Sequence, residues 1–110
     1  MSLQSADKEA GAYAVAPRVS LADIEAAIAG RYHLTGTEAL GPDKPSHESL
    51  DVLSICILVM RNGFTVIGKS APASAANFNR ELGQKLAYED AVRQLWPLMG
   101  FALRDRLAGF

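Results

Sequence analysis

The most distinctive hydrophobic pattern lies between residues 50 and 70, where a long apolar run is followed by Asn62-Gly63 and then a second, alternating run. The first run is too continuous for a half-buried helix, and its many β-branched residues favour a strand. Asn-Gly between two such runs is typical of a type I′ hairpin turn, in which both central residues have positive φ. The sequence therefore predicts two antiparallel strands that close on this turn.

A two-residue turn also sets the register of the two strands. It predicts that Arg61 faces Phe64, Val59 faces Val66 and Ile57 faces Gly68. One face of the hairpin is then expected to carry Ile55, Ile57, Val59, Phe64 and Val66, and the other Cys56, Leu58, Met60 and Ile67 with Thr65 and Lys69. Since both faces of the first strand are apolar, each needs something to cover it.

Helical patterns flank the hairpin on both sides. Ser20 and Asp23 fit a capping box at the start of a short helix that Gly30 is expected to stop. Large apolar residues recur near the helical period through residues 74–108, and Ser74 is a plausible N-cap. This predicted stripe consists of Phe78, Leu82, Leu86, Val92, Trp96, Met99, Leu103 and Leu107.

Proline and glycine divide the rest of the chain. Pro97 lies inside the C-terminal helical pattern and predicts a kink or break there, because proline lacks the backbone donor. Gly83 and Gly100 within the same pattern suggest close approach of another segment. Gly68 within the second strand indicates either a bulge or a close backbone contact. Residues 36–49 are rich in Gly, Pro, Ser and charge and read as a loop.

These patterns predict an α+β fold. A β-hairpin over residues 50–70, with a third short strand suggested at residues 32–35, packs against a short N-terminal helix and a long, proline-kinked C-terminal helix. Residues 18–110 are expected to form this single domain. Residues 1–17 are small, polar and aperiodic, and are expected to be a flexible arm. The long helix covers one face of the hairpin, and either the first helix or a second subunit covers the other.

Composition excludes several classes of protein. The 110 residues are 49% hydrophobic and 21% charged, as in an ordinary globular domain. Residues 1–51 hold eight acidic and four basic side chains, and the sequence lacks the strong basic stripe that is typical of a dedicated nucleic-acid binder. A single cysteine excludes an intramolecular disulfide framework. With no apolar signal core and no long apolar run, we expect a soluble, intracellular protein that does not enter a membrane.

No set of residues in the sequence predicts catalysis, a metal or a cofactor. Cys56, His33 and His47 match no zinc spacing, and the cysteine lies in the most apolar run, where a reactive thiolate is not expected. Gly63, Gly68 and Ser70 do not form a phosphate-binding loop. Asn77 near a helix start is read as a local cap rather than as a ligand site. We therefore expect a protein that is not an enzyme.

The best candidates for an interface are aromatic and basic residues. Trp96 and Phe101 are of the kind enriched at protein interfaces, although Trp96 also falls in the predicted core stripe. Arg61, Lys69, Arg104 and Arg106 are candidates for a weak phosphate-facing patch, with a solvated helix end as the alternative for the two arginines of the C-terminal helix.

The order of features from Ile55 to Leu107 resembles a known family. The series is Ile55-Cys56, Arg61-Asn62-Gly63-Phe64-Thr65-Val66, Gly68-Lys69-Ser70-Ala71, Asn77-Phe78, Gly83, Ala87, Ala91, Trp96-Pro97-Leu98, Gly100-Phe101 and Leu103-Arg104-Asp105. It is similar to the small tailed-phage and prophage proteins named for phage gene products forty-nine and sixty-six. The resemblance covers the C-terminal half of the chain. Pro72 departs from the pattern, which leads us to expect a cysteine there, so no role of that thiol carries over.

The resemblance implies a phage or prophage origin and a host-cytoplasm setting, and it implies no chemistry. Together with the hairpin that is apolar on both faces, it leads to the hypothesis of a non-enzymatic accessory protein. We expect it to act as a protein-binding module and homodimer whose further partner is a host or phage protein that the sequence does not name. Nucleic-acid binding during phage replication or transcription is the alternative.

Overall fold

Three antiparallel strands, arranged in chain order, form the sheet in the computed structural model, which describes residues 2–110. The elements are α1 (Leu3–Tyr13), α2 (Leu21–Ala27), β1 (Ile28–Thr35), α3 (Gly36–Leu40), the 3₁₀ helix η1 (Glu48–Val52), β2 (Ser54–Met60), β3 (Thr65–Ser70), the 3₁₀ helix η2 (Ala75–Asn77) and α4 (Arg80–Leu107). The predicted α+β class, with its hairpin, third strand, short helix and long C-terminal helix, is confirmed.

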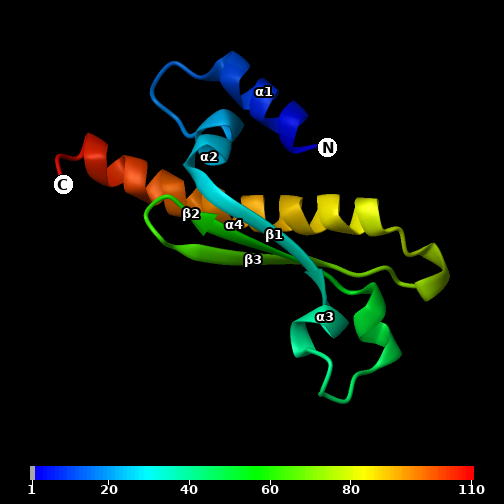
Figure 1. Ribbon diagram of the computed structural model, residues 1–110. Helices are drawn as coiled ribbons and strands as arrows, with labels where there is room; N and C mark the ends of the chain where they lie inside the picture. Colours follow the sequence, from blue (N-terminus) through cyan, green and yellow to red (C-terminus); the bar gives the residue numbers. More distant parts are fainter. Residues whose placement is uncertain (1) are drawn as a thin grey trace.

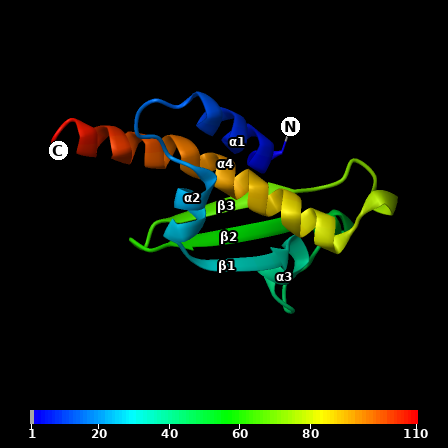
Figure 2. The ribbon, with the colours of Figure 1, turned by 90° about the horizontal axis from the view of Figure 1, so that it is seen from above.

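The helices α1, α2 and α4 all lie on one side of the sheet (Figure 1). Figure 2 shows α4 crossing the strands obliquely, with α2 on the same side and α1 beside α4. The core forms between these helices and the covered face of the sheet, and its fully buried members include Ile24 of α2, Leu58 of β2 and Leu95 of α4. The alternative in which the first predicted helix covers the second face of the hairpin is therefore wrong.

The hairpin lies where it was predicted, but its turn and register differ from the prediction. Only Gly63 of the turn has positive φ, at 88°, and Met60 N–H donates to Phe64 O over 2.8 Å. Arg61, Asn62 and Gly63 thus form a three-residue loop that ends in a left-handed glycine, rather than a type I′ turn. The extra loop residue moves β3 by one position, so that Val59 pairs with Thr65.

This shift exchanges the two faces of β3, because side chains alternate along a strand. Val66 pairs with Leu58 and is buried under α4. The prediction had paired Val66 with Val59 and placed it on the opposite face, with Ile57. Ile67 pairs with Ile57 and is 59% exposed on the other face. The face of β2 that carries Ser54, Cys56, Leu58 and Met60 is buried throughout.

Small residues, rather than the large ones predicted, bring α4 onto the sheet. Ala87 and Ala91 are completely buried, and a Cβ placed on Gly68 would overlap the Ala87 carbonyl and the Ala91 amide. Likewise, a Cβ on Gly83 would overlap the Ser54 hydroxyl. The close approach predicted at Gly68 and Gly83 is confirmed, whereas nothing lies near the Cβ position of Gly100.

The predicted stripe of large apolar residues is only partly buried. Val92 belongs to the core, and Trp96 and Met99 pack against it. Leu82, Leu86 and Leu107 are instead 51%, 40% and 59% exposed. Helical periodicity alone does not show which apolar side faces the sheet, because alanine and glycine contribute little to the pattern.

The ends and interior of α4 also correct the prediction. Asn79, not Ser74, caps the helix, since the Asn79 side chain accepts the Leu82 N–H over 3.0 Å. Ser74 precedes η2 and makes no capping hydrogen bond. The helix runs through Pro97 without a break, so of the predicted kink or break the kink stays a prediction, and Pro97 is exposed.

One segment predicted to be a loop contains helices, and one helix boundary differs from the prediction. Residues 36–49 include α3 and the start of η1, where the sequence suggested only a loop. The strand β1 starts at Ile28, so the preceding helix ends at Ala27 rather than near Gly30. The Ser20–Asp23 capping box at the start of α2 is confirmed.

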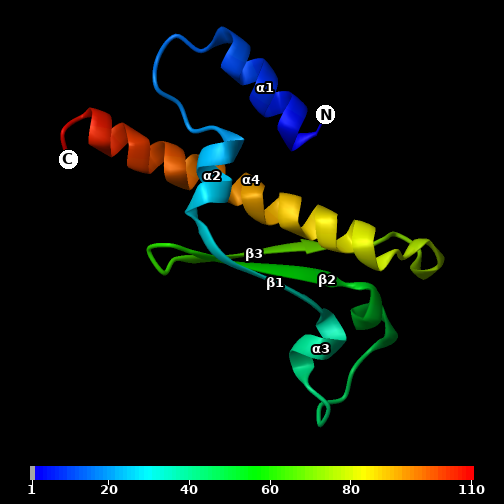
Figure 3. The same ribbon diagram turned by 45° about the horizontal axis from the view of Figure 1, so that its top comes forward.

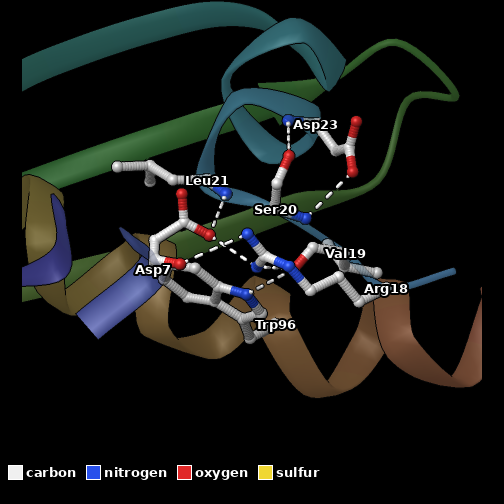
Figure 4. A network of polar contacts seen from close by, with 7 residues as sticks. All are labelled: Asp7, Arg18, Val19, Ser20, Leu21, Asp23 and Trp96. Carbon is white, nitrogen blue, oxygen red and sulfur yellow. Dashed lines mark hydrogen bonds and ion pairs between the residues drawn. The ribbon is translucent and has the colours of Figure 1, made fainter. Parts of the chain in front are cut away.

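The first residues form a helix where the sequence suggested an irregular arm. Ser2 and Ser5 make a capping box at the start of α1, and Leu3 is 9% exposed. Figure 4 shows how this helix is connected to the domain: Asp7 accepts hydrogen bonds from the Arg18 guanidinium, over 2.8 Å, and from the Leu21 amide. The pKa of Asp7 is lowered chiefly by the bond from Arg18. The division into residues 1–17 and 18–110 otherwise stays a prediction.

Replacing Gly68 by alanine is expected to lower the free energy of unfolding by at least about 2 kcal/mol, because overpacking against the backbone of α4 forces the helix away from β3. Gly100→Ala is the matched control, since its Cβ meets nothing and helix propensity favours alanine by about 1 kcal/mol. Urea unfolding followed by circular dichroism measures both. Equal stability of the Gly68→Ala variant and the wild type would contradict the close contact.

Candidate functional site

The face of the sheet that points away from α4 is an apolar surface that the fold leaves uncovered. No helix of residues 2–110 lies over it (Figures 1 and 3). We call it the open face. The strand register assigns to it Tyr32 and Leu34 of β1, Ile55, Ile57 and Val59 of β2, and Thr65, Ile67 and Lys69 of β3.

The open face is apolar at its centre and carries one charge, on Lys69. Its central residues Ile55, Ile57 and Val59 are half-buried among their neighbours, while Tyr32 and Ile67 on the outer strands are 58% and 59% exposed. A contiguous apolar patch of this kind, on a small domain, is typical of an interaction site.

A projecting unit stands at one end of the open face. It consists of α3, the following loop and η1, which extend beyond the sheet on the side opposite α4 (Figure 3). We call residues 36–53 the ledge. Leu50 and Leu53 pack close to the buried Gly36, and Thr37 donates a hydrogen bond from its hydroxyl to Asp51 over 2.5 Å. The ledge holds four acidic side chains and one basic side chain.

The β3 edge of the sheet bonds to side chains of α4. Two backbone groups of β3 are occupied by side chains of α4: Lys69 N–H donates to Asp90 over 2.9 Å, and the Ile67 carbonyl accepts from Gln94 over 2.7 Å. These bonds occupy groups that would otherwise pair with a further strand, so β3 is protected against edge-to-edge association.

A shallow apolar groove, of about 380 Å³, lies at the opposite end of the sheet from the ledge, between the hairpin turn and the C-terminal half of α4. Met60, Phe64, Leu98 and Met99 are among the apolar residues that line it, and Phe64 is 52% exposed. Arg61 and Arg106 are the charged residues of its lining, so this turn end of the molecule is basic.

The five candidate interface residues do not form one surface. Arg61 lies at the turn, and Lys69 lies at the other end of β3, beside Ile55. Phe101 is 71% exposed and Arg104 is exposed on α4. Trp96 is half-buried, and its Nε1–H donates to the Val19 carbonyl over 3.2 Å, so it fixes the segment before α2 onto α4 (Figure 4).

Sequence reasoning missed Tyr32, Ile57 and Ile67 as interface candidates. Their signal was present in the period-two alternation of the strands, but it required the correct register of β3. The two-residue turn placed Ile67 on the face with Leu58, which the structure shows to be the covered one.

The cluster around His33 has a structural rather than a ligand-binding arrangement. Arg31 donates from Nε to His33 Nε2 over 2.7 Å, and its guanidinium lies 3.7 Å from the centre of the Tyr88 ring. Burial, and then the nearby Arg31 charge, lower the pKa of His33, and burial raises the pKa values of Cys56 and Tyr88. Cys56 is completely buried, as expected for a small apolar side chain in a core.

Residues 2–110 hold neither a metal-ion cluster nor a membrane-spanning helix. No group of three or more His, Cys, Asp or Glu side chains in this part of the chain is arranged to hold a metal ion. No helix in it combines the length and the apolar character needed to cross a membrane.

The fold and its surfaces define a small α+β domain with helices on one face of a three-stranded sheet and an apolar open face on the other. Residues 19–107 match the model of the Phage protein (N4 Gp49/phage Sf6 gene 66) family, and the chain belongs to this family. The predicted resemblance is thus confirmed, and it extends well beyond the C-terminal half. No curated protein and no solved structure matches the chain.

The stability of the domain is expected to fall on mild acidification because of His33. Its pKa is lowered in the folded state from the usual 6.5, so the unfolded chain binds more protons between these two values. Protonation would remove the lone pair that accepts from Arg31 and place two positive charges together. The contribution of neutral His33 to the free energy of unfolding is therefore complete above about pH 6.5, and it is lost as the pH falls through the lowered pKa of the folded state.

Urea unfolding at about pH 7.5 and about pH 5.5 measures this loss. His33→Gln keeps an acceptor for Arg31 but does not titrate, and should show a smaller difference between the two pH values. An unchanged difference in the His33→Gln variant would contradict this assignment.

Proposed function

We propose that this protein is a non-enzymatic phage or prophage accessory protein that acts by binding protein, as a homodimer in the cytoplasm of the host. The observation that carries the proposal is the open face, an apolar sheet surface that no helix of the described chain covers. Membership of the phage protein family supports the origin. A further host or phage protein is the expected partner of the dimer.

Burial of the open face would favour association. Side chains such as Tyr32 and Ile67 lose unfavourable contact with water when a second apolar surface covers them, which contributes about 25 cal/mol per Å² of apolar area. A three-stranded sheet with only one face covered also gains rigidity from a second layer.

The roles of the perturbed acidic groups support a non-enzymatic function. The carboxyl groups of Asp23 and Glu38 have lowered pKa values chiefly because backbone amides at Ser20 and Thr35 donate to them in capping boxes. The pKa of Asp7 is lowered chiefly by the hydrogen bond from Arg18, in the contact that connects α1 to the domain. Displaced pKa values often indicate catalytic groups, but each of these displacements arises from a bond that stabilises the fold.

Nucleic-acid binding is the alternative, and its best support is the pair Arg61 and Arg106 at the turn groove. Lys69 lies at the opposite end of the sheet from Arg61, beside the acidic ledge. A backbone-tracking site needs several basic groups along one path, because affinity for phosphates grows with the number neutralised. We therefore prefer protein binding.

Light scattering coupled to gel filtration at micromolar concentrations tests the proposal. We expect a dimer for the wild type and a monomer for Ile67→Glu, because the new carboxylate would be buried without a partner in the interface. The Ile67 side chain is exposed in the single chain, so the variant should fold normally. Leu82→Glu is the control, since Leu82 is 51% exposed on α4, away from the open face, and should leave the dimer intact. A monomeric wild type would refute the proposal.

A further inference from the structure

We propose that the second copy lies on the open face with its strands antiparallel to those of the first, so that each acidic ledge contacts the Arg61 turn of the other copy. This inference rests on the proposed function and specifies the orientation of the dimer. Three features of the structure lead to it: the size of the open face, the position of the ledge and the distribution of charge.

The open face alone is too small for a stable interface. Three strands spaced by about 4.8 Å, with about 3.3 Å per residue over seven residues, give a footprint of roughly 14 Å by roughly 23 Å. That is roughly 300 Å² before the relief of side chains is counted, whereas stable interfaces bury about 800 Å² on each partner. The interface must therefore extend past the ends of the strands, where the ledge and the turn lie.

The ledge limits how two open faces can meet. It projects on the open-face side at the end of the sheet where β1 ends and β2 begins, and the hairpin turn lies at the other end (Figures 1 and 3). Stacked sheets approach to about 10 Å, so a projecting helix reaches past the surface of the partner sheet. A two-fold axis along the strands would bring both ledges together at one end. An axis across the strands instead places each ledge beyond the turn of the other copy.

Charge favours the second arrangement. Glu38 of the ledge pairs with Arg80 over 3.6 Å, and Asp51 accepts from Thr37. Asp43 and Glu48 are exposed and, within the described residues, have no ion-pair partner. At the turn, Arg61 uses its Nε to bond the Ala26 carbonyl, which leaves the terminal nitrogens of its guanidinium free for an acceptor.

The antiparallel arrangement therefore joins an acidic ledge to a basic turn, and two-fold symmetry repeats the contact at both ends of the sheet. The alternative arrangement places acid beside acid and arginine beside arginine. Like charges across an interface disfavour association strongly, so the charge pattern selects one orientation of two otherwise similar sheet packings.

Charge reversal tests this orientation. The ledge variant is Asp43→Lys with Glu48→Lys, and the turn variant is Arg61→Glu; all three positions are exposed. We expect each variant alone to dimerise at least about tenfold more weakly than the wild type at low salt, because each creates like-charge contacts at both ends. Carrying both changes in one chain should restore most of the affinity. Lys85→Glu on α4 is the control and should dimerise normally.

A second measurement uses the two variants together. An equimolar mixture of the ledge variant and the turn variant should form a heterodimer, because every ledge then meets a turn of opposite charge. Analytical ultracentrifugation with one species labelled measures this association. Near-wild-type dimerisation of both single variants would overturn the orientation, and if Ile67→Glu is still monomeric, the proposed function would stand. The orientation would also be overturned if the single variants dimerise more weakly and the combined variant does not restore the affinity.

Discussion

The contact between Gly68 and the backbone of α4 sets the distance between helix and sheet, and much of the architecture depends on that distance. Ala87 and Ala91 lie directly against the strand, so there is room for neither a side chain on Gly68 nor a large one at these two positions of the helix. A closely packed helix covers one face of the hairpin well, and Asp90 and Gln94, from the same part of α4, then reach the edge of β3. The helix thereby protects both the covered face of the sheet and one of its edges.

The same arrangement explains why the other face stays open. The helices α1 and α2 are held on the α4 side by the Asp7–Arg18 contact and by the bond from Trp96 to Val19, so neither is placed to cover the second layer. The segment that does reach the open-face side is the ledge, and it stands at the end of the strands. The surface that remains is apolar at its centre, the acidic ledge stands at one end of it and the Arg61 turn lies beyond the other, and our proposals assign this surface to self-association.

Much of this fold could be predicted from the sequence because its signals are local. The alternating runs around Asn62-Gly63 place the hairpin, and Ser20 with Asp23 places the start of α2. The register could not be predicted, because Asn-Gly is compatible with both a two-residue turn and a three-residue loop, which differ by one residue. This difference of one residue in loop length decides whether Val66 or Ile67 faces the core. The residues of the open face could therefore not be predicted. The side of α4 that packs on the sheet could not be predicted either. Alanines and glycines form that side, whereas the exposed Leu82 and Leu86 dominated the apolar pattern.

The most direct test of the account is a cross-link at the centre of the open face. Ile57 lies in the middle of β2, the central strand, so a two-fold axis through the face brings the two copies of this residue together. The native Cys56 is buried and its pKa is raised, so it should not compete. With a short bis-maleimide linker that spans the gap between stacked sheets, Ile57→Cys is expected to form a cross-linked dimer rapidly, and Leu82→Cys, exposed on α4, should not. Failure of Ile57→Cys to cross-link faster than Leu82→Cys would contradict burial of this face by a second copy.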